Sequence, residues 1–343
     1  MAILITGGAG FIGSNFIIDW FESSDENIIN LDALTYAGNL ENLSSIQNQP
    51  NYDFVQGSIN NSELISQILK QHRPRAVINF AAESHVDRSI VGPEEFIQTN
   101  IIGTFRLLVA IQNFWESLDQ SSKNNFRFMQ ISTDEVYGSL NYSDPPFTEV
   151  NQYQPNSPYS ASKASADHLV RAFHHTYNLP VITTNCSNNY GPFQYPEKII
   201  PLCIHNILTK KLIPIYGDGK NIRDWLYVKD HCAAIRKVLD KGKIGEVYNI
   251  GGNCEQSNIS LVETICEILD ELNSKTKDNS YKNLISYVKD RPGHDRRYAM
   301  DISKISQELN WYPQEKFTSG IRKTINWYLE NQNWVKNVMN RTN

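Results

Sequence analysis

The first half of the chain alternates short apolar segments with stretches of helical periodicity. The apolar segments predict strands at 2–6, 27–31, 52–56, 75–80, 126–131 and 180–185. Between them, residues with helical spacing predict helices near 11–23, 61–71, 93–117 and 158–177. This alternation is typical of βαβ units, and the strands are almost continuously apolar. We therefore expect an α/β fold, a Rossmann-type doubly wound parallel sheet with helices on both faces.

The pattern changes after about residue 190, where prolines and glycines break the chain into shorter elements. We predict a Rossmann domain over 1–190, to which some later segments return, and a smaller α/β substrate lobe mainly over 191–332. Residues 333–343 are rich in asparagine and are predicted to form a frayed tail.

The composition and charge argue against several classes of protein. The formal net charge of the 343 residues is −5, which argues against nucleic acid or an anionic membrane surface as a partner. No apolar run reaches about 18 residues, and the apolar opening is too short for a signal peptide. The five cysteines are odd in number and form no CxxC pair, so we expect free thiols in the cytoplasm and no metal site.

A glycine-rich turn follows the first predicted strand and opens the first predicted helix. Gly7, Gly10 and Gly13 would let the backbone approach a pyrophosphate at the N-terminus of that helix, although a tight turn without a ligand is the alternative. Asp32 ends the second predicted strand, where an acid can accept hydrogen bonds from an adenosine ribose. No arginine follows in 33–35 to bind a 2′-phosphate, so the sequence favours NAD over NADP.

A tyrosine and a lysine lie four residues apart on the predicted helix over 158–177. Tyr159 and Lys163 would share one face, and an ammonium beside a phenol is expected to lower the pKa of the phenol toward that of a general base. Taken alone, this spacing is common, and a surface pair is the alternative. Ser132 and Thr133 close a predicted strand, where a hydroxyl could bind a substrate oxygen while Tyr159 takes its proton.

Two carboxylates follow directly at that strand end. If Asp134 and Glu135 are buried side by side, at least one pKa is raised, so that one group can donate a proton while the other acts as a base. For such a pair taken alone, a solvated loop or a helix cap is the alternative.

These motifs, in this order, resemble the extended short-chain dehydrogenase/reductase family over nearly the whole chain. The string STDEVYG at 132–138 resembles the nucleotide-sugar 4,6-dehydratases of that family, as do the segments 33–43, 81–90, 186–192, 222–228 and 291–301. The resemblance implies a lyase that oxidises dTDP-glucose at C4, eliminates water across C5 and C6, and returns the hydride to C6. It also implies a tightly bound NAD that is regenerated in each turnover, and a homodimer packed through the helices at 93–117 and 158–177.

The resemblance assigns roles to individual residues. Tyr159 would accept the O4 proton and Glu135 the C5 proton, while Asp134 would protonate the departing hydroxyl. The implied catalytic residues are Thr133, Asp134, Glu135, Tyr159 and Lys163. The implied cofactor-binding residues are Gly7, Gly10, Phe11, Ile12, Gly13, Asp32, Leu34, Thr35, Ser58, Ile59, Ala81, Ala82, Thr99, Tyr159, Lys163 and Asn189. The implied substrate-binding residues are Ser84, Thr133, Asn188, Glu197, Lys198, Pro214, Tyr216, Arg223, Asn258, Arg291, His294 and Tyr298.

Four further residues qualify this interpretation. Ser58 stands where the family usually has an aspartate that holds the adenine, and Asn185 stands where an arginine is usual. We expect the first to weaken adenine recognition and the second to concern the surface around the site. His85 and His294 lack the spacing of a histidine-based catalytic site, so structural roles are expected for them.

Two alternatives remain open on the sequence. A nucleotide-sugar 4-epimerase would share the NAD, Tyr159 and Lys163 but would have no use for Asp134 and Glu135. Dehydratases acting on UDP-glucose, CDP-glucose or GDP-mannose share the same chemistry, so the nucleotide of the substrate is less firmly indicated than the reaction.

Overall fold

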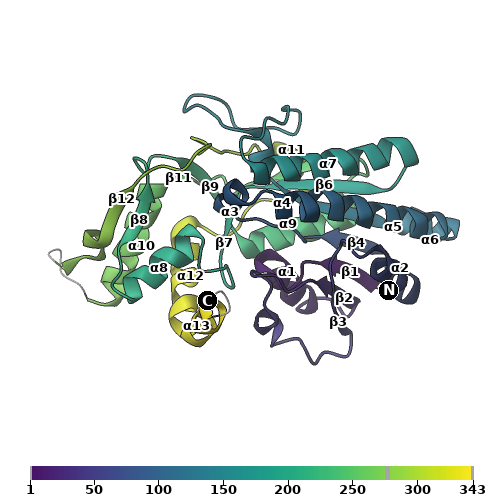
Figure 1. Ribbon diagram of the computed structural model, residues 1–343, viewed down its shortest axis with the longest axis horizontal. Coiled ribbons are helices and arrows are strands. Elements are labelled where there is room, and N and C mark those ends of the chain that lie inside the picture. The colour runs from purple at the N-terminus through teal and green to yellow at the C-terminus, as the bar shows by residue number, and fades with distance from the viewer. Residues whose placement is uncertain (1, 275–278, 341–343) are drawn as a thin grey trace.

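A sheet of seven parallel strands forms the centre of the molecule (Figure 1). The computed structural model describes residues 2–274 and 279–340. The order across the sheet is β10-β6-β5-β4-β1-β2-β3, as expected for a doubly wound fold. The strands are β1 (Ala2–Thr6), β2 (Asn27–Asp32), β3 (Tyr52–Gln56), β4 (Ala76–Asn79), β5 (Arg127–Thr133), β6 (Val181–Cys186) and β10 (Val247–Ile250).

Helices cover both faces of this sheet, because its strands are apolar on both sides. In β1, Ile3 and Ile5 pack on one face with α1 (Phe11–Phe21), α9 (Val228–Lys241) and α11 (Ser303–Leu309). Ala2 and Leu4 pack on the other face with α2 (Ser62–His72), α5 (Thr104–Glu116) and α7 (Pro158–Tyr177). The predicted fold class and the six predicted strands are therefore confirmed, with strand ends that differ by at most two residues.

The single helix predicted over 93–117 is interrupted. It consists of a short α4 (Glu94–Phe96), a π-helical stretch at Ile97–Gly103, and α5. The π-helical stretch carries Thr99 to the cavity described below. Such π-helical turns are frequent at functional sites, and periodicity alone does not reveal them.

A second group of elements packs around its own apolar core, at the opposite end of the molecule from β3 and α2 (Figure 1). It contains a three-stranded sheet with the order β11-β9-β7 and the pair β12-β8. Its strands are β7 (Asn188–Tyr190), β8 (Ile213–Tyr216), β9 (Ile222–Tyr227), β11 (Glu255–Ser257) and β12 (Ile285–Val288). Its helices are α8 (Ile199–Leu208), α10 (Asn258–Leu272), α12 (Phe317–Glu330) and α13 (Gln332–Asn340).

The prediction of a frayed tail is wrong for residues up to 340. Helix α13 buries Trp334, Val335 and Val338 against the second core, and the Trp334 indole donates a hydrogen bond of 2.8 Å to Asn42 Oδ1. The apolar spacing of these residues outweighs the polar composition of the segment. Residues 341–343 lie outside the described residues. In the described ranges, neither α13 nor any other helix combines the length and apolar character needed to cross a membrane.

Candidate active site

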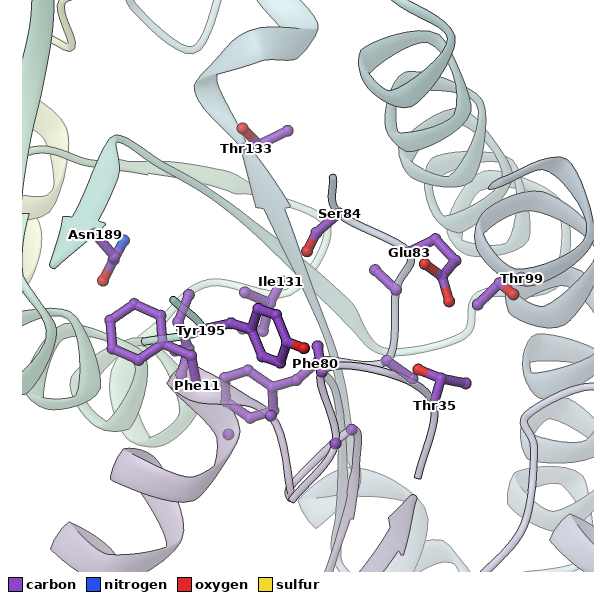
Figure 2. Close-up of a pocket in the computed structure, with 18 of the residues that line it drawn as sticks. Phe11, Thr35, Phe80, Glu83, Ser84, Thr99, Ile131, Thr133, Asn189 and Tyr195 are labelled. Atoms are coloured by element: carbon purple, nitrogen blue, oxygen red, sulfur yellow. The ribbon is translucent and has the colours of Figure 1, made fainter. Parts of the chain in front are cut away.

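A cavity of about 350 Å³ opens at the carboxyl ends of the central strands, where ligands bind in doubly wound sheets. Figure 2 shows side chains from several of these strand ends converging on it. The predicted site residues that line it are Gly7, Gly10, Phe11, Ile12, Gly13, Asp32, Thr35, Ser58, Ile59, Ala81, Ala82, Ser84, Thr99, Thr133, Asp134, Glu135, Tyr159, Lys163, Asn188, Asn189, Glu197 and Lys198.

The glycine-rich turn lines the cavity, and its backbone segments lie in close contact with one another. Gly7 has a φ of +73°, which disfavours any residue with a side chain. A Cβ on Gly13 would lie 2.4 Å from the carbonyl oxygen of Gly7. The amide of Ser14 donates to the Gly10 carbonyl, so helix α1 begins directly at the cavity. The backbone can therefore approach a bound phosphate closely at this helix start.

Asp32 lies at the carboxyl end of β2 and is held by two backbone amides. Its Oδ2 accepts a hydrogen bond of 2.8 Å from Ala9, and its Oδ1 accepts one of 2.8 Å from Leu34. A carboxylate can accept about four hydrogen bonds, so capacity remains for ribose hydroxyls. Leu34 itself does not line the cavity. Leu34 contributes to the site only through its backbone amide, which binds Asp32, and its φ is positive at 52°.

Several residues that line the cavity were not predicted from the sequence. Phe80 follows β4 directly, and Figure 2 shows it beside Phe11 with Tyr195 close by. Phe80 could have been found by the argument used for Thr133, because both residues stand where a parallel strand ends. Tyr195 lies in a loop outside the segments that carry the family resemblance. Glu83 lies in a loop within one of those segments, 81–90, but the resemblance assigned it no role.

The two adjacent carboxylates follow the end of β5 in a 3₁₀ turn over Asp134–Tyr137, where Asp134 is buried and Glu135 is partly buried. Burial and the charge of Glu135 raise the pKa of Asp134 well above its usual range. Burial also raises the pKa of Glu135, but three cations, Arg291, Arg223 and Lys198, oppose this effect. The neighbouring acids therefore differ in their charge surroundings, which favour a neutral Asp134 and an ionised Glu135.

Tyr159 and Lys163 are both buried on the side of α7 that faces the cavity. Burial raises the pKa of Tyr159 well above 10, so the expectation that this pKa is lowered toward that of a general base is wrong as a net effect. Lys163 Nζ instead donates a hydrogen bond of 2.8 Å to the carbonyl oxygen of Ile131. The Thr133 hydroxyl acts in the opposite direction to burial and lowers the pKa of Tyr159.

Glu197 joins three segments at the rim of the cavity. Its carboxylate accepts a hydrogen bond of 3.1 Å from the Tyr36 hydroxyl and lies 3.2 Å from His85 Nε2 and 3.6 Å from Arg88. Beside it, Lys198 Nζ donates to the carbonyl oxygen of Ser84 at 3.0 Å. The structural role expected for His85 stays a prediction, which its contact with Glu197 supports.

The remaining predicted substrate residues lie in a second group outside the cavity lining: Pro214, Tyr216, Arg223, Asn258, Arg291, His294 and Tyr298. The guanidinium of Arg223 lies 4.4 Å from the centre of the Tyr298 ring and donates to the Asp295 carbonyl. Arg291 donates to Asp87 at 2.9 Å. Both arginines lower the pKa of Glu135, so this group extends the site from the carboxylates toward the second lobe.

The two departures from the family pattern have different surroundings. Ser58 lines the cavity, as its predicted role requires. Asn185, expected near the surface, is fully buried in β6, where its amide donates to the hydroxyls of Tyr137 and Tyr153. The surface expectation for Asn185 was therefore wrong, because a strand buried on both faces has no exposed positions.

Comparison with known proteins shows similarity along almost the entire chain. The family described as GDP-mannose 4,6 dehydratase matches residues 4–324. A dTDP-glucose 4,6-dehydratase of Xanthomonas campestris is 55% identical over 336 residues, which cover 98% of this chain and 95% of the relative. The dTDP-glucose 4,6-dehydratase 1 of Escherichia coli is 56% identical over 346 residues, with the same coverage.

Similarity to solved structures extends over the same length. A dTDP-glucose 4,6-dehydratase of Bacillus anthracis in complex with NAD has 49% identity and a TM-score of 0.87, covering 98% of this chain and 99% of that one. A UDP-glucose 4-epimerase of Thermotoga maritima has 29% identity and a TM-score of 0.83, covering 97% and 100%. The fold is thus common to dehydratases and epimerases, so the site must distinguish the two reactions.

Proposed function

This chain belongs to the GDP-mannose 4,6-dehydratase family, and from that membership we propose that it converts dTDP-glucose to dTDP-4-keto-6-deoxyglucose and water. The observation that carries the proposal is the pair formed by the buried Asp134 and the partly buried Glu135, which lines the same cavity as Tyr159. Moving a hydride requires one base for the hydroxyl that is oxidised. Eliminating water requires a second base and an acid, and this pair supplies both.

NAD fits the cavity as a resident cofactor. The backbone at Gly7 and Gly13 leaves no room for side chains beside the start of α1, which suits the pyrophosphate. Asp32 suits the adenosine ribose, while Tyr159 and Lys163 line the same cavity near the end of β5. When bound, NAD supplies the acceptor for the C4 hydride and later returns that hydride to C6, so that no external reductant is consumed.

The chain's own residues carry the protons. Tyr159 accepts the proton of the C4 hydroxyl as the 4-ketone forms. The ketone acidifies the hydrogen on the adjacent carbon, C5, and Glu135 removes this proton. Asp134 donates its proton to the C6 hydroxyl, which departs as water with the electrons of the C6–O bond. Glu135, whose proton exchanges with solvent, would protonate C5 as the bound cofactor supplies the hydride to C6. The proton held by Tyr159 would pass through solvent to replace the one that Asp134 gave up.

The charges around the two carboxylates support the roles of Asp134 as the general acid and Glu135 as the general base. A general acid must hold its proton at the working pH, and the pKa of Asp134 is raised by burial and by Glu135. A general base must be ionised, and three cations oppose the rise in the pKa of Glu135.

The same cations are suited to the diphosphate of the substrate. We propose that Arg223, Arg291 and Lys198 bind it, because a guanidinium offers a planar fork of donors to phosphate oxygens. Arg291 is paired with Asp87 in this structure, and the Tyr216 hydroxyl lies 3.5 Å from the same carboxylate. Tyr216 is partly exposed, which leaves its ring available to a nucleobase.

A direct assay tests the proposed reaction. The protein is incubated with dTDP-glucose without added reductant, and the product is measured by the alkali-induced absorbance of a 4-keto-6-deoxy sugar. Product from UDP-glucose but none from dTDP-glucose would refute the substrate and leave the mechanism standing. A galactose-type sugar as the product would instead identify an epimerase.

A variant tests the role given to Glu135. Glu135→Gln should still reduce the bound cofactor, because Tyr159 is intact, but should form no dehydrated product. Full dehydration by this variant would contradict the role of Glu135.

The domain organisation and the assembly are part of the proposal. We propose that 1–190 form the cofactor domain together with returning segments, and that 191–332 mainly bind the substrate. The pairing of β10 with β6 supports this division, because a strand from beyond residue 190 joins the large sheet.

We also propose a homodimer through α5 and α7. Leu108 and Phe173 belong to the monomer core, whereas Phe105 and Val109 are 43% and 36% exposed on one side of α5. A sedimentation mass of one subunit would refute the dimer.

A cytoplasmic location is also proposed. Its support is that all five cysteines are free thiols, as expected in a reducing compartment. Fractionation of the source cells with an antibody against the chain would test this location, and recovery outside the cytoplasm would refute it.

A further inference from the structure

Asp167 continues the line of catalytic side chains along α7. It follows Tyr159 and Lys163 at successive intervals of four residues, which places all three on one face of the helix. Asp167 is only 4% exposed, and it does not line the cavity. A carboxylate so buried is costly unless hydrogen bonds or an opposite charge compensate for the loss of water.

One oxygen of this carboxylate is bound to the strand that holds Lys163. Asp167 Oδ2 accepts a hydrogen bond of 2.5 Å from the Ser132 hydroxyl. The residue before Ser132 is Ile131, whose carbonyl oxygen accepts the 2.8 Å hydrogen bond from Lys163 Nζ. Asp167 and Lys163 are therefore fixed to consecutive residues of β5.

The other oxygen has no comparable bond. Among the described residues, Asp167 Oδ1 is buried without a hydrogen-bond partner of normal geometry. The hydroxyl of Tyr153 faces the carboxylate and lowers its pKa, and Tyr137 is a further titratable neighbour. Hydrogen bonding thus compensates one oxygen more fully than the other, and a nearby positive charge would stabilise the ionised carboxylate.

Lys163, one helical turn before Asp167 on the same face of α7, is the cation that acts on this carboxylate. Burial raises the pKa of Asp167 to about 7, and the charge of Lys163 is the largest effect opposing this rise. Burial lowers the pKa of Lys163, and Asp167 is the group that opposes this effect most, followed by the Cys186 thiol. The two groups stabilise each other's ionised forms.

We propose that Asp167 is a positioning residue for the reaction, the counter-ion that keeps Lys163 protonated and fixed beside Tyr159. This proposal rests on the proposed function for the role of Lys163, but the electrostatic coupling of Asp167 to Lys163 does not depend on it. Burial disfavours the phenolate of Tyr159, and a positive charge on Lys163 would act against this effect. Removal of Asp167 should therefore impair proton transfer without removing any group that contacts the substrate.

The first experiment measures the pKa of Lys163 directly, without turnover. The full-length protein, freed of nucleotide, is labelled with trace acetic anhydride over a range of pH, and Lys163 is quantified by mass spectrometry against the exposed Lys336. Lys163 lines the cavity, so a small reagent can reach it. In Asp167→Asn the apparent pKa of Lys163 should fall by about one unit or more.

Two further variants make the test specific. Glu149→Gln also neutralises a partly buried carboxylate, but this group does not affect the pKa of Lys163 and should leave it unchanged. If Asp167→Asn does not fold, Ser132→Ala removes the hydrogen bond to Oδ2 and should shift the pKa of Lys163 in the same direction, by less.

The second readout is the pH profile of kcat on dTDP-glucose. In Asp167→Asn the basic limb should move to lower pH by the same amount, because Lys163 loses its proton earlier, and Asp167→Glu should restore most of the profile. An unchanged pKa of Lys163 in a folded Asp167→Asn protein would overturn the proposal. An inactive wild type would refute the proposed function instead, and the labelling result would still decide the role of Asp167.

Discussion

The hydroxyl of Thr133 donates a hydrogen bond of 3.2 Å to Asp134 Oδ1. The other oxygen of that carboxyl group, Oδ2, is buried and has no hydrogen-bond partner in the described part of the chain. Since burial also raises the pKa of Asp134, the group is set up to carry a proton on Oδ2 while Oδ1 accepts. This is the arrangement that a general acid requires before a hydroxyl can leave as water.

Replacement of Asp134 should separate oxidation from elimination. In Asp134→Asn, kcat for the dehydrated product should fall by about 10²- to 10⁴-fold, the usual contribution of one general acid. The bound cofactor should still become reduced on addition of dTDP-glucose, which its absorbance reports. Tyr159→Phe is the matched comparison, because it should abolish both signals. A cofactor that remains oxidised in Asp134→Asn would contradict the order of steps.

The acid limb of the pH profile should report Glu135. A base works only when ionised, so kcat should be lost as the pH falls through its pKa, which burial places above the usual 4.5. Arg291 is the cation that lowers this pKa most. Arg291→Gln should therefore move the acid limb of kcat, measured at saturating substrate, to higher pH by up to about one unit.

The control for this shift is Arg296→Gln, whose guanidinium binds Asp218 at 2.9 Å and has no such effect on Glu135. An equal shift in the two variants would show that the effect is not specific to the site.

A methyl group on the glycine-rich turn should expel the cofactor. A Cβ on Gly13 would lie 2.4 Å from the Gly7 carbonyl oxygen, so Gly13→Ala must displace the backbone at the proposed pyrophosphate position. The purified variant should hold at least tenfold less NAD than the wild type, measured after acid release. Gly92→Ala, where the nearest atom to the new Cβ is 3.9 Å away, should retain its NAD.

Helix α13 should contribute measurably to stability. Trp334 is buried and bound to Asn42, so Trp334→Ala should lower the free energy of unfolding by about 3–5 kcal/mol. Urea unfolding followed by circular dichroism measures this change. Lys336→Ala, on the exposed side of the same helix, should change it by less than about 0.5 kcal/mol. Equal effects would mean that α13 does not pack as described.

Local sequence patterns predicted those parts of the fold that local physics determines. The strands of the large sheet are mostly apolar runs, and the cavity forms where those runs end, which is why Asp32 and Thr133 could be placed in advance. The π-helical turn at Ile97–Gly103 was not predicted, because it changes the hydrogen bonding of a helix without changing its composition. Helix α13 was not predicted either, because its three buried side chains are few among polar residues and the composition suggested a tail.

Electrostatics was the least predictable part of the site. Spacing put Lys163 near Tyr159 and suggested a lowered pKa for the phenol, but burial dominates in the folded chain. No role was predicted for Asp167, because a single acid on a helix carries no signal in the sequence and only tertiary packing places it against Ser132. Burial of charge depends on the whole fold, and no local pattern reports it.

The fate of the hydrogen on C4 tests the central claim most directly. The protein is incubated with dTDP-glucose deuterated at C4, without added reductant, and the product is examined by mass spectrometry and proton NMR. The account predicts one deuterium in the 6-methyl group of a 4-keto-6-deoxy sugar and a solvent-derived hydrogen at C5. Deuterium that remains at C4 of a sugar with its 6-hydroxyl intact, or no turnover at all, would contradict it.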